Sequence, residues 1–268
     1  MNRASILIEA DELLRKLDDE NIRIYDATIA DNVYLQEHIP GAAFFDHQSF
    51  SDPNNPYDLM ILPDAELAAQ IGRAGISNDS EVVVYACGML PYAVRAWWVL
   101  RYAGHNNVRI LNGGFAAWKE AGGQIEQQTR TYEPSSFKAH FTPGMFASKD
   151  EVLASIEKKD IAIVNVLPLA SYEASHIVGS ICLPCLDLMQ GMDYFLPDDQ
   201  LAPRLKEVSQ HKRIITYCGG GIAAAINAAA HLMAGHENVA IYDGSLYEWL
   251  GEGLPTNGTG KWEVWLQK

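Results

Sequence analysis

The chain contains an internal duplication, and this limits its fold more than any other feature of the sequence. Cys87 and Cys218 are 131 residues apart, and the 38 residues after each keep that offset. His38-Ile-Pro-Gly-Ala and His176-Ile-Val-Gly-Ser recur at an offset of 138, so the first copy carries seven extra residues before its cysteine. The segments 87–125 and 218–256 share twelve identical pairs: Cys87/Cys218, Gly88/Gly219, Ala93/Ala224, Ala103/Ala234, Gly104/Gly235, His105/His236, Asn107/Asn238, Val108/Val239, Ile110/Ile241, Gly113/Gly244, Trp118/Trp249 and Gly122/Gly253. We therefore expect two homologous domains of ordinary size.

A polar stretch separates the two copies. Residues 124–145 lack apolar periodicity and contain Pro134, Pro143 and Gly144. This composition is typical of a connector, and we expect it to run over both domains. The sequence thus predicts an N-terminal domain at 1–125, a linker at 126–145 and a C-terminal domain at 146–268.

Strand and helix patterns alternate along each copy. Short apolar segments predict strands at 22–26, 42–45, 81–86 and 108–111 in the first copy, and at 161–166, 177–183, 213–217 and 239–242 in the second. Helices are predicted at 64–74, 93–103, 149–157, 201–209 and 222–234, and Ser148 with Glu151 resembles a capping box. This alternation predicts the α/β class, with two tandem domains that each hold a mainly parallel sheet flanked by helices.

Composition and charge exclude several classes of protein. Hydrophobic residues make up 48% of the chain, enough for two cores, and the formal net charge of −14 disfavours binding to nucleic acid or anionic membrane. The N-terminus lacks a basic region followed by an apolar segment, so we expect a cytoplasmic protein. Four cysteines in 268 residues do not form a disulfide framework, and we expect neither a cofactor nor a bound metal.

The most informative cysteine is Cys218. It ends the apolar segment Arg213–Tyr217, and three glycines and an alanine-rich helix pattern follow it. Glycines let several amide N–H groups point toward the sulfur, and a helix N-terminus adds positive potential. The pattern therefore predicts a thiolate nucleophile. The alternative interpretation is a buried structural cysteine at a strand end.

Several motifs in the expected order resemble the two-domain rhodanese family of thiosulfate and 3-mercaptopyruvate sulfurtransferases over essentially the whole chain. They are Asp26-Ala-Thr, His38-Ile-Pro-Gly-Ala-Ala-Phe-Phe-Asp46, Ile61-Leu-Pro63, Arg95-Ala-Trp-Trp98, Gly104-His105, Leu111-Asn-Gly-Gly-Phe-Ala-Ala-Trp118, Cys218-Gly219-x-Gly221 and Tyr242-Asp-Gly-Ser-x-x-Glu-Trp249. The resemblance implies a non-catalytic N-terminal domain and a C-terminal cysteine that carries sulfane sulfur as a persulfide. The implied catalytic residue is Cys218, and the implied substrate-binding residues are Gly219, Gly220, Gly221, Ile222 and Ala223.

The chain departs from the family pattern at positions that, by the resemblance, are implied to contact the substrate. Gly220 and Ala223 stand where mercaptopyruvate enzymes typically carry Ser and Thr, and Met60 replaces a histidine. Leu167 stands where the family usually has an arginine, and a second arginine ahead of His176 is absent. Arginine binds carboxylate or sulfonate groups through paired hydrogen bonds. We therefore expect inefficient use of mercaptopyruvate.

The other cysteines allow further interpretations. Cys87 also ends a strand, but its loop contains Pro91 and bulky apolar residues, so we expect a thiol packed at the domain interface rather than a nucleophile. Cys182 and Cys185 form a C-x-x-C pattern that could mark a redox pair or half of a zinc site; a structural role is favoured because no second ligand pair follows.

Two other function classes compete with the sulfurtransferase. Cell-cycle dual-specificity phosphatases also place a thiolate before a helix, but they need an arginine six residues after the cysteine, where this chain has Ala224 and Ala93. The remaining alternative is a catalytically weak rhodanese-like module that carries sulfur or binds a partner. As partners of an active enzyme we expect a small donor of the thiosulfate, mercaptopyruvate or persulfide type, a thiol or cyanide acceptor, and a thioredoxin-type reductant.

Overall fold

Each half of the chain builds a five-stranded parallel sheet. The computed structural model describes residues 1–258 and 260–264. The first sheet has the order β1-β5-β4-β2-β3, and the second has the order β6-β13-β12-β7-β9. The strands of the first are β1 (Leu7–Ile8), β2 (Ile22–Asp26), β3 (Ala43–Phe44), β4 (Glu81–Tyr85) and β5 (Val108–Leu111), and those of the second are β6 (Phe146–Ala147), β7 (Ile161–Asn165), β9 (Ile181–Cys182), β12 (Arg213–Tyr217) and β13 (Val239–Tyr242).

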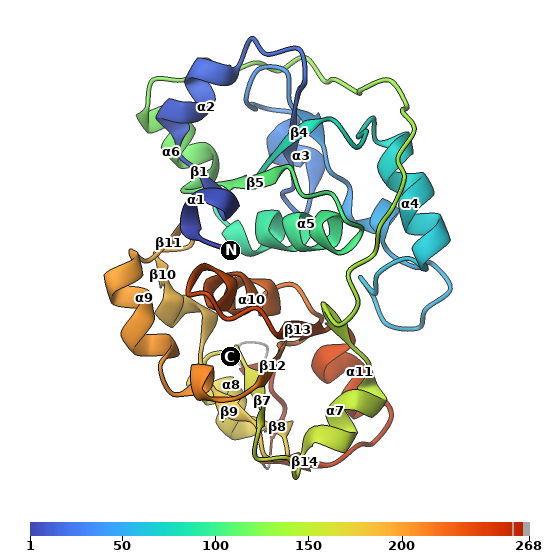
Figure 1. The fold of residues 1–268 in the computed structure, drawn as a ribbon, viewed down its shortest axis with the longest axis vertical. Coiled ribbons are helices and arrows are strands. Elements are labelled where there is room, and N and C mark those ends of the chain that lie inside the picture. The colour runs from blue at the N-terminus through green and yellow to red at the C-terminus, as the bar shows by residue number, and fades with distance from the viewer. Residues whose placement is uncertain (259, 265–268) are drawn as a thin grey trace.

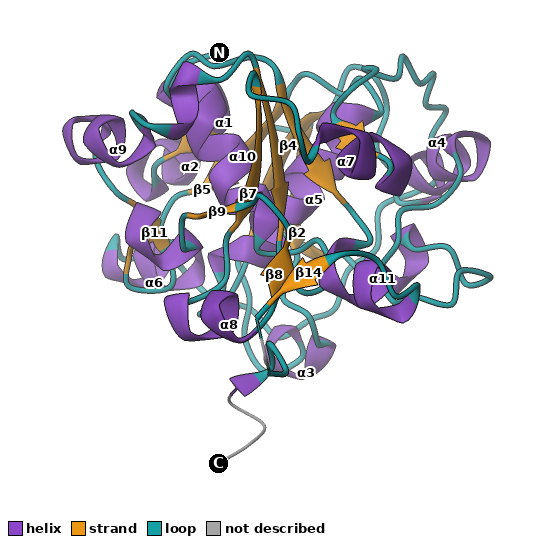
Figure 2. Cartoon of the chain, turned by 90° about the horizontal axis from the view of Figure 1, so that it is seen from below, coloured by secondary structure: helices purple, strands orange, loops and turns teal. Residues whose placement is uncertain are grey.

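Helices cover the sheets on both sides (Figure 2). The first half contains α1 (Arg3–Ile6), α2 (Ala10–Lys16), α3 (Asp31–Tyr34), α4 (Asp64–Arg73), α5 (Leu90–Tyr102) and α6 (Gly114–Glu120), with the 3₁₀ turn η1 (His47–Phe50). The second half contains α7 (Lys149–Ser155), α8 (Leu169–Ala174), α9 (Asp198–Leu205), α10 (Ala224–Met233) and α11 (Ser245–Gly251), with η2 (Cys185–Leu188) and η3 (Val208–Gln210). This arrangement confirms the predicted α/β class with two tandem, mainly parallel sheets.

The two sheets match strand for strand, as the duplication predicts. Their central strands β4 and β12 each lead into a cysteine, and β2 and β7 lie beside them in equivalent register. Tyr85 is aligned with Asp26 in the first sheet, and Tyr217 is aligned with Asn165 in the second. Each of these tyrosines accepts a hydrogen bond through its hydroxyl, from the amide of Ile39 or of Ile177. The two loops therefore start from the same framework, but Cys218 directly follows the aligned tyrosine, whereas Ala86 stands between Tyr85 and Cys87.

Helices α5 and α10 lie side by side between the two halves (Figure 1). All ten residues of α10 are buried, and most of α5 is buried as well. Helices that are mainly apolar around their circumference need cover on all sides, and here each helix packs between its own sheet and the other half. One hydrophobic core consequently runs through both halves.

An ion pair also crosses the boundary between the halves. Arg95 on α5 contacts Asp243, the residue after β13, with 2.6 Å between Nη2 and Oδ1, and both side chains are buried. Asp243 also accepts the amide N–H of Ile61 at 2.7 Å. A buried charge of this kind needs its partner, so the pair fixes how the halves meet.

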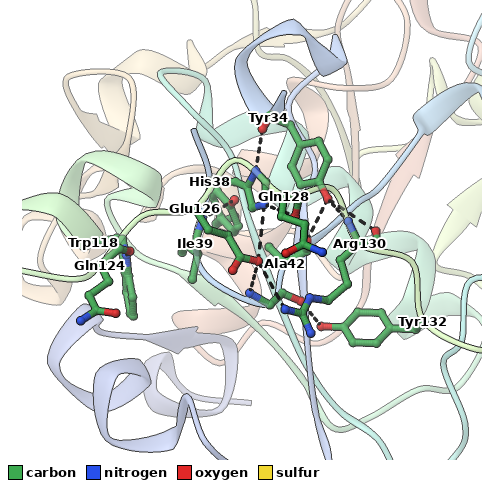
Figure 3. A network of polar contacts seen from close by, with 12 residues as sticks. Tyr34, His38, Ile39, Ala42, Trp118, Gln124, Glu126, Gln128, Arg130 and Tyr132 are labelled. Carbon is green, nitrogen blue, oxygen red and sulfur yellow. Dashed lines mark hydrogen bonds and ion pairs between the residues drawn. The ribbon is translucent and has the colours of Figure 1, made fainter. Parts of the chain in front are cut away.

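The connector lies along the first half of the molecule. Figure 3 shows Glu126, Arg130 and Tyr132 beside Tyr34 and His38. The Tyr132 hydroxyl donates to the carbonyl of Gly41, and the Arg130 amide donates to the Tyr34 hydroxyl. Backbone bonds from Ser135, His140 and Thr142 also go to the first half. The expectation of a connector shared between both domains is thus wrong for most of its length, while the domain limits at 125 and 146 stay a prediction.

A short hairpin crosses in the opposite direction. Strands β10 (Met189–Gln190) and β11 (Tyr194–Phe195) pair antiparallel, and the turn between them reaches the first half. The carbonyls of Met192 and Asp193 accept the amides of Leu90 and Gly113 at 3.0 and 2.8 Å. We call residues 189–195 the crossing hairpin.

Several predicted elements differ in extent. The strand expected at 177–183 is divided into β8 (His176–Ile177), which pairs with β14 (Thr256–Asn257), and β9 in the main sheet. The helix expected from 222 begins at Ala224, because the residues before it form the loop after the cysteine. Ser148 accepts the Glu151 amide as predicted, but the Glu151 carboxylate pairs with Arg213 instead of closing a capping box.

No helix in the described part of the chain is both long and apolar enough to cross a bilayer.

Candidate active site

Cys218 lies at the carboxyl end of β12, the central strand of the second sheet. It is buried, with 3% of its surface exposed. Its amide N–H donates to Ser245 Oγ at 3.0 Å, and the Gly221 amide donates to the same oxygen at 3.1 Å. The Ser245 hydroxyl in turn donates to the carbonyl of Tyr242 at 2.8 Å. Ser245 therefore ties both ends of the cysteine loop to the end of β13.

Ser245 holds this position at a conformational cost. Its φ is 48°, in the left-handed region that residues other than glycine rarely occupy. Strained backbone persists where the surrounding structure requires it, often at functional sites. The three hydrogen bonds of its hydroxyl give a physical reason for that strain here.

The remaining amides of the loop have no protein acceptor. Among the described residues, none accepts the N–H of Gly219, Gly220, Ile222 or Ala223. The ten-residue helix α10 begins directly after them, at Ala224. Unoccupied amides and the positive end of a helix stabilise an anion held beside them. The loop can thus hold a negatively charged sulfur or a sulfur atom added to it.

The glycines of this loop serve different purposes. Gly221 has φ 80°, and a Cβ there would lie 2.7 Å from the carbonyl oxygen of Asp243. A Cβ at Gly219 would overlap the ring of Trp262, and one at Gly220 would lie 3.1 Å from the Tyr247 ring. Gly221 is therefore required by the turn itself, and the other two allow aromatic rings to lie close to the loop.

Cys218 opens into a cleft between the two halves of the molecule. The cleft has a volume of about 390 Å³. The first half contributes Leu59, Met89, Pro91 and Tyr92 to its walls. The second half contributes Val166, Leu167, Pro168, Cys185, Leu186, Met192, Cys218, Gly219, Gly220, Ile222, Ala223, Tyr247 and Trp262.

Most of the residues that the sequence predicted for the site lie at this cleft. Cys218, Gly219, Gly220, Ile222 and Ala223 line it, whereas Gly221 faces Asp243 instead. Sequence reasoning missed Tyr247, Trp262 and Ser245. For Ser245 a signal was present, because it belongs to the Tyr242-Asp-Gly-Ser motif; Trp262 lies outside every repeated segment and gave none.

The structure also locates the positions at which the chain departs from the family pattern. Leu167 lines the cleft, so an apolar side chain stands in the wall where relatives are expected to have a cation. Met60 faces a separate cavity with Lys149 and Tyr242, and its neighbour Leu59 reaches the cleft instead. These positions therefore supply neither charge nor a proton donor to Cys218.

The loop after Cys87 is closed by contrast. The Cys87 amide donates to Thr28 Oγ1 at 3.0 Å, the Leu90 amide is taken by the crossing hairpin, and Pro91 has no N–H. Burial raises the pKa of the Cys87 thiol, and the carboxylate of Asp26 adds to this rise. The thiol packs against the core of the first half.

The C-x-x-C pair does not behave as one unit. Cys182 is half-buried with its sulfur 4.0 Å from the Leu167 carbonyl, while Cys185 is buried and lines the cleft. Burial, reinforced by nearby Cys218, raises the pKa of Cys185 to about 12. Cys185 therefore stays protonated near neutral pH. In the described part of the chain, no group of three or more His, Cys, Asp or Glu side chains could hold a metal.

Comparison with known proteins agrees with this architecture of paired domains and a strand-end thiol. The model of the rhodanese-like domain matches residues 9–121 and 148–252, and the chain belongs to this family. Thiosulfate sulfurtransferase from Bos taurus is 33% identical over 251 residues, which cover 88% of this chain and 82% of the relative. The 3-mercaptopyruvate sulfurtransferase from Escherichia coli K12 is 32% identical over 263 residues, 90% of this chain and 94% of the relative.

A solved structure supports the same assignment. The crystal structure of the 3-mercaptopyruvate sulfotransferase SseA from Escherichia coli superposes with a TM-score of 0.81 at 30% identity, covering 89% of this chain and 98% of that one. These relatives confirm the prediction of an enzyme of the sulfurtransferase class.

Proposed function

We propose that the protein transfers sulfane sulfur from a small donor to a thiophilic acceptor through a persulfide on Cys218. The observation that carries the proposal is the position of Cys218 beside four amides, those of Gly219, Gly220, Ile222 and Ala223, which have no acceptor among the described residues. In the described structure, Cys218 is also the only cysteine that both ends a central strand and opens into the cleft. Such a cradle stabilises charge on sulfur before and after transfer.

The chemistry has two steps. The Cys218 thiolate attacks the outer sulfur of the donor, a new S–S bond forms, and the bond from that sulfur to the donor breaks with its electron pair leaving on the donor. An acceptor, cyanide or a thiol, then attacks the outer sulfur of the persulfide and returns Cys218 as the thiolate. A thioredoxin-type dithiol is a suitable acceptor because its second thiol can release the sulfur as sulfide.

Intact-mass measurement tests this proposal. After incubation with a sulfur donor and removal of excess reagent, the wild-type protein should gain the mass of one sulfur atom. Cyanide should remove that mass and yield thiocyanate. Cys218→Ser should gain nothing, and an equal gain in this variant would overturn the assignment.

A sulfur-carrier module is the second candidate. The absence of charged side chains in the described walls of the cleft favours it, because small anionic donors would bind weakly there. A carrier would form the persulfide and release thiocyanate once per protein molecule, whereas an enzyme turns over repeatedly. Counting thiocyanate released per protein distinguishes the two.

A further inference from the structure

The side chains that line the Cys218 cleft are mostly apolar among the residues that the structure describes. The described lining has no Asp, Glu, Lys, Arg or His side chain. Its groups able to ionise are Cys185, Cys218, Tyr92 and Tyr247, and burial raises the pKa of both tyrosines above the ordinary value. The cleft is therefore an apolar space around one reactive sulfur.

Among the described residues, two side chains that could carry positive charge lie behind the Cys218 loop, and both already have partners within the protein. Arg95 and His47 border a small separate cavity on the far side of Ile222. Arg95 is neutralised by Asp243, and His47 binds the Ala27 carbonyl through Nε2 at 2.8 Å. Burial lowers the pKa of His47 to about 4, so its ring is neutral at physiological pH. Neither group offers net positive charge to a donor in the cleft.

This distribution of charge favours some classes of sulfur donor over others. The loop amides and α10 can stabilise one negative charge at the sulfur that is transferred. A second charge on the carrier group would sit among apolar side chains with no counterion in the described lining, which is strongly unfavourable. A donor with an uncharged carrier group avoids that cost.

The shape of the cleft favours a bulky apolar carrier group. Trp262 lies over Gly219 and meets Tyr247 edge to face, with 5.3 Å between ring centroids and 72° between planes. At the mouth, Met89, Leu186 and Met192 are exposed apolar side chains. A cavity of about 150 Å³ suffices for benzene, so this cleft can hold an aromatic ring beside the sulfur.

We infer that Trp262, with Tyr247, makes the site select sulfur donors whose carrier group is aromatic or apolar, such as organic thiosulfonates and organic persulfides, over dianionic donors. The inference rests on the proposed function. For a thiosulfonate, Cys218–S⁻ attacks the outer sulfur of R–SO₂–S⁻; the S–S bond to the sulfonyl sulfur breaks, and R–SO₂⁻ leaves with the electron pair. For a persulfide, R–S–SH gives Cys218–S–SH and R–S⁻. Neither step needs an external oxidant or reductant.

A matched donor series tests the selectivity. Thiosulfate, methanethiosulfonate and benzenethiosulfonate share the transferred sulfur and differ in the carrier group. With cyanide as acceptor, kcat/KM for thiocyanate formation should rise along this series, by about tenfold or more from first to last. Each value is divided by the rate of the same donor with a small free thiol, which removes intrinsic reactivity. Thiosulfate used as well as benzenethiosulfonate would overturn the inference and leave the proposed function intact, whereas no sulfur adduct from any donor would overturn the proposed function.

Variants locate the selectivity. Trp262→Ala should lose about fivefold or more of kcat/KM for benzenethiosulfonate, mainly through KM, with a much smaller change for methanethiosulfonate. Trp262→Phe should keep the preference. Leu153→Ala, at an exposed apolar position on α7 outside the cleft, is the control. Equal losses for both donors would overturn the role of Trp262, and Tyr247→Leu, at a half-exposed position, provides the same test if Trp262→Ala does not fold.

Discussion

The loops that carry Cys87 and Cys218 follow matching central strands, yet Cys218 comes directly after the aligned tyrosine, Cys87 comes two residues after it, and their amides have different partners. Beside Cys218, Ser245 ties two amides and leaves four others without a protein acceptor in the described structure. Beside Cys87, the position of Ser245 is taken by Gly114, Thr28 accepts the Cys87 amide, and the crossing hairpin accepts the Leu90 amide. One framework thus supports an open anion cradle in one copy and a closed loop in the other.

The charge near the two cysteines also differs between the copies. Asp26 ends β2 near Cys87, and the aligned residue near Cys218 is the neutral Asn165. Both side chains accept the amide two residues later at 2.9 Å through Oδ1, so the structural role is kept while the charge is not. The carboxylate of Asp193 also faces the Gly88 amide. Carboxylate charge thus opposes ionisation of the Cys87 thiol, which teaches that the framework alone does not create a nucleophile.

Exchange of each cysteine should give the largest difference. Cys218→Ser is expected to lower sulfur transfer by about a thousandfold or more, because the nucleophile is lost. Cys87→Ser is expected to keep at least about half of the activity, because its loop has no free cradle. Thiocyanate formation measures both, and a loss in Cys87→Ser at an unchanged melting temperature would reverse the roles of the two loops.

Gly221→Ala should have the second largest effect on sulfur transfer. A Cβ at 2.7 Å from the Asp243 carbonyl oxygen, at φ 80°, must displace the loop, and a shift of about 1 Å at a reacting group can reduce kcat about a hundredfold. Gly88→Ala is the matched control, since φ is 72° but no atom lies within 4 Å of the added Cβ. It should lower stability by about 1 kcal/mol from backbone strain and leave activity nearly unchanged. Similar kinetic losses in both variants would contradict the comparison.

Ser245→Gly installs the residue of the first copy. The left-handed strain disappears, but the Cys218 and Gly221 amides lose their acceptor. We expect about a tenfold fall in kcat/KM with little loss of melting temperature, because one hydrogen-bonding group worth about 1 kcal/mol is removed while strain is relieved. Unchanged activity would show that the hydroxyl does not organise the loop.

Asn165→Asp transfers the charge of the first copy to the second. We expect the pH profile for alkylation of Cys218 by iodoacetamide to move upward by about one pH unit, because a carboxylate nearby opposes the thiolate. Sulfur transfer at pH 7 should fall by several-fold as a result. Both proteins should also carry Cys87→Ser, so that Cys87 does not contribute to the alkylation signal. An unchanged pH profile would show that the charge at position 165 does not explain the difference between the two loops.

Asp26→Asn is the reverse exchange and should have the smallest effect. Burial raises the pKa of the Asp26 carboxyl in the folded protein, so folding takes up protons between the usual value of about 3.9 and the raised value. The free energy of unfolding therefore falls as the pH rises through that window, and above the window the buried, ionised carboxylate destabilises the protein to its full extent. Asn should stabilise the protein by about 1 kcal/mol at pH 7 and by less at pH 4. Melting curves at both values of pH measure this, and an equal gain at both would contradict the linkage.

The duplication and the buried strands were accessible from the sequence. Segments 108–111, 213–217 and 239–242 are mainly apolar and rich in β-branched residues, and the structure reproduces their predicted limits. The two-residue edge strands β1 and β6 were missed, because so short a run has no periodicity of its own. The geometry of the Cys218 loop was accessible because its determinants are contiguous in the chain, and the chemistry inferred for it stays a prediction.

The walls of the cleft could not be predicted in the same way. Leu59, Met89, Met192 and Trp262 come from four distant segments, and contacts between the two halves, such as the packing of α5 against α10 and the crossing hairpin, bring them together. Leu59 reaches the cleft with φ 63°, which no propensity would assign to leucine. The apolar character of the site therefore belongs to tertiary structure and not to any motif.

The crossing hairpin also sets an order of events during synthesis. The ribosome delivers the Cys87 loop long before residues 189–195, so the amides of Leu90 and Gly113 face water until the hairpin arrives. Domains generally begin to fold as they emerge, from the N-terminus onward. The first half is thus finished by a segment of the second, and a nascent chain that stops short of the hairpin carries an uncapped loop that a completed molecule does not have.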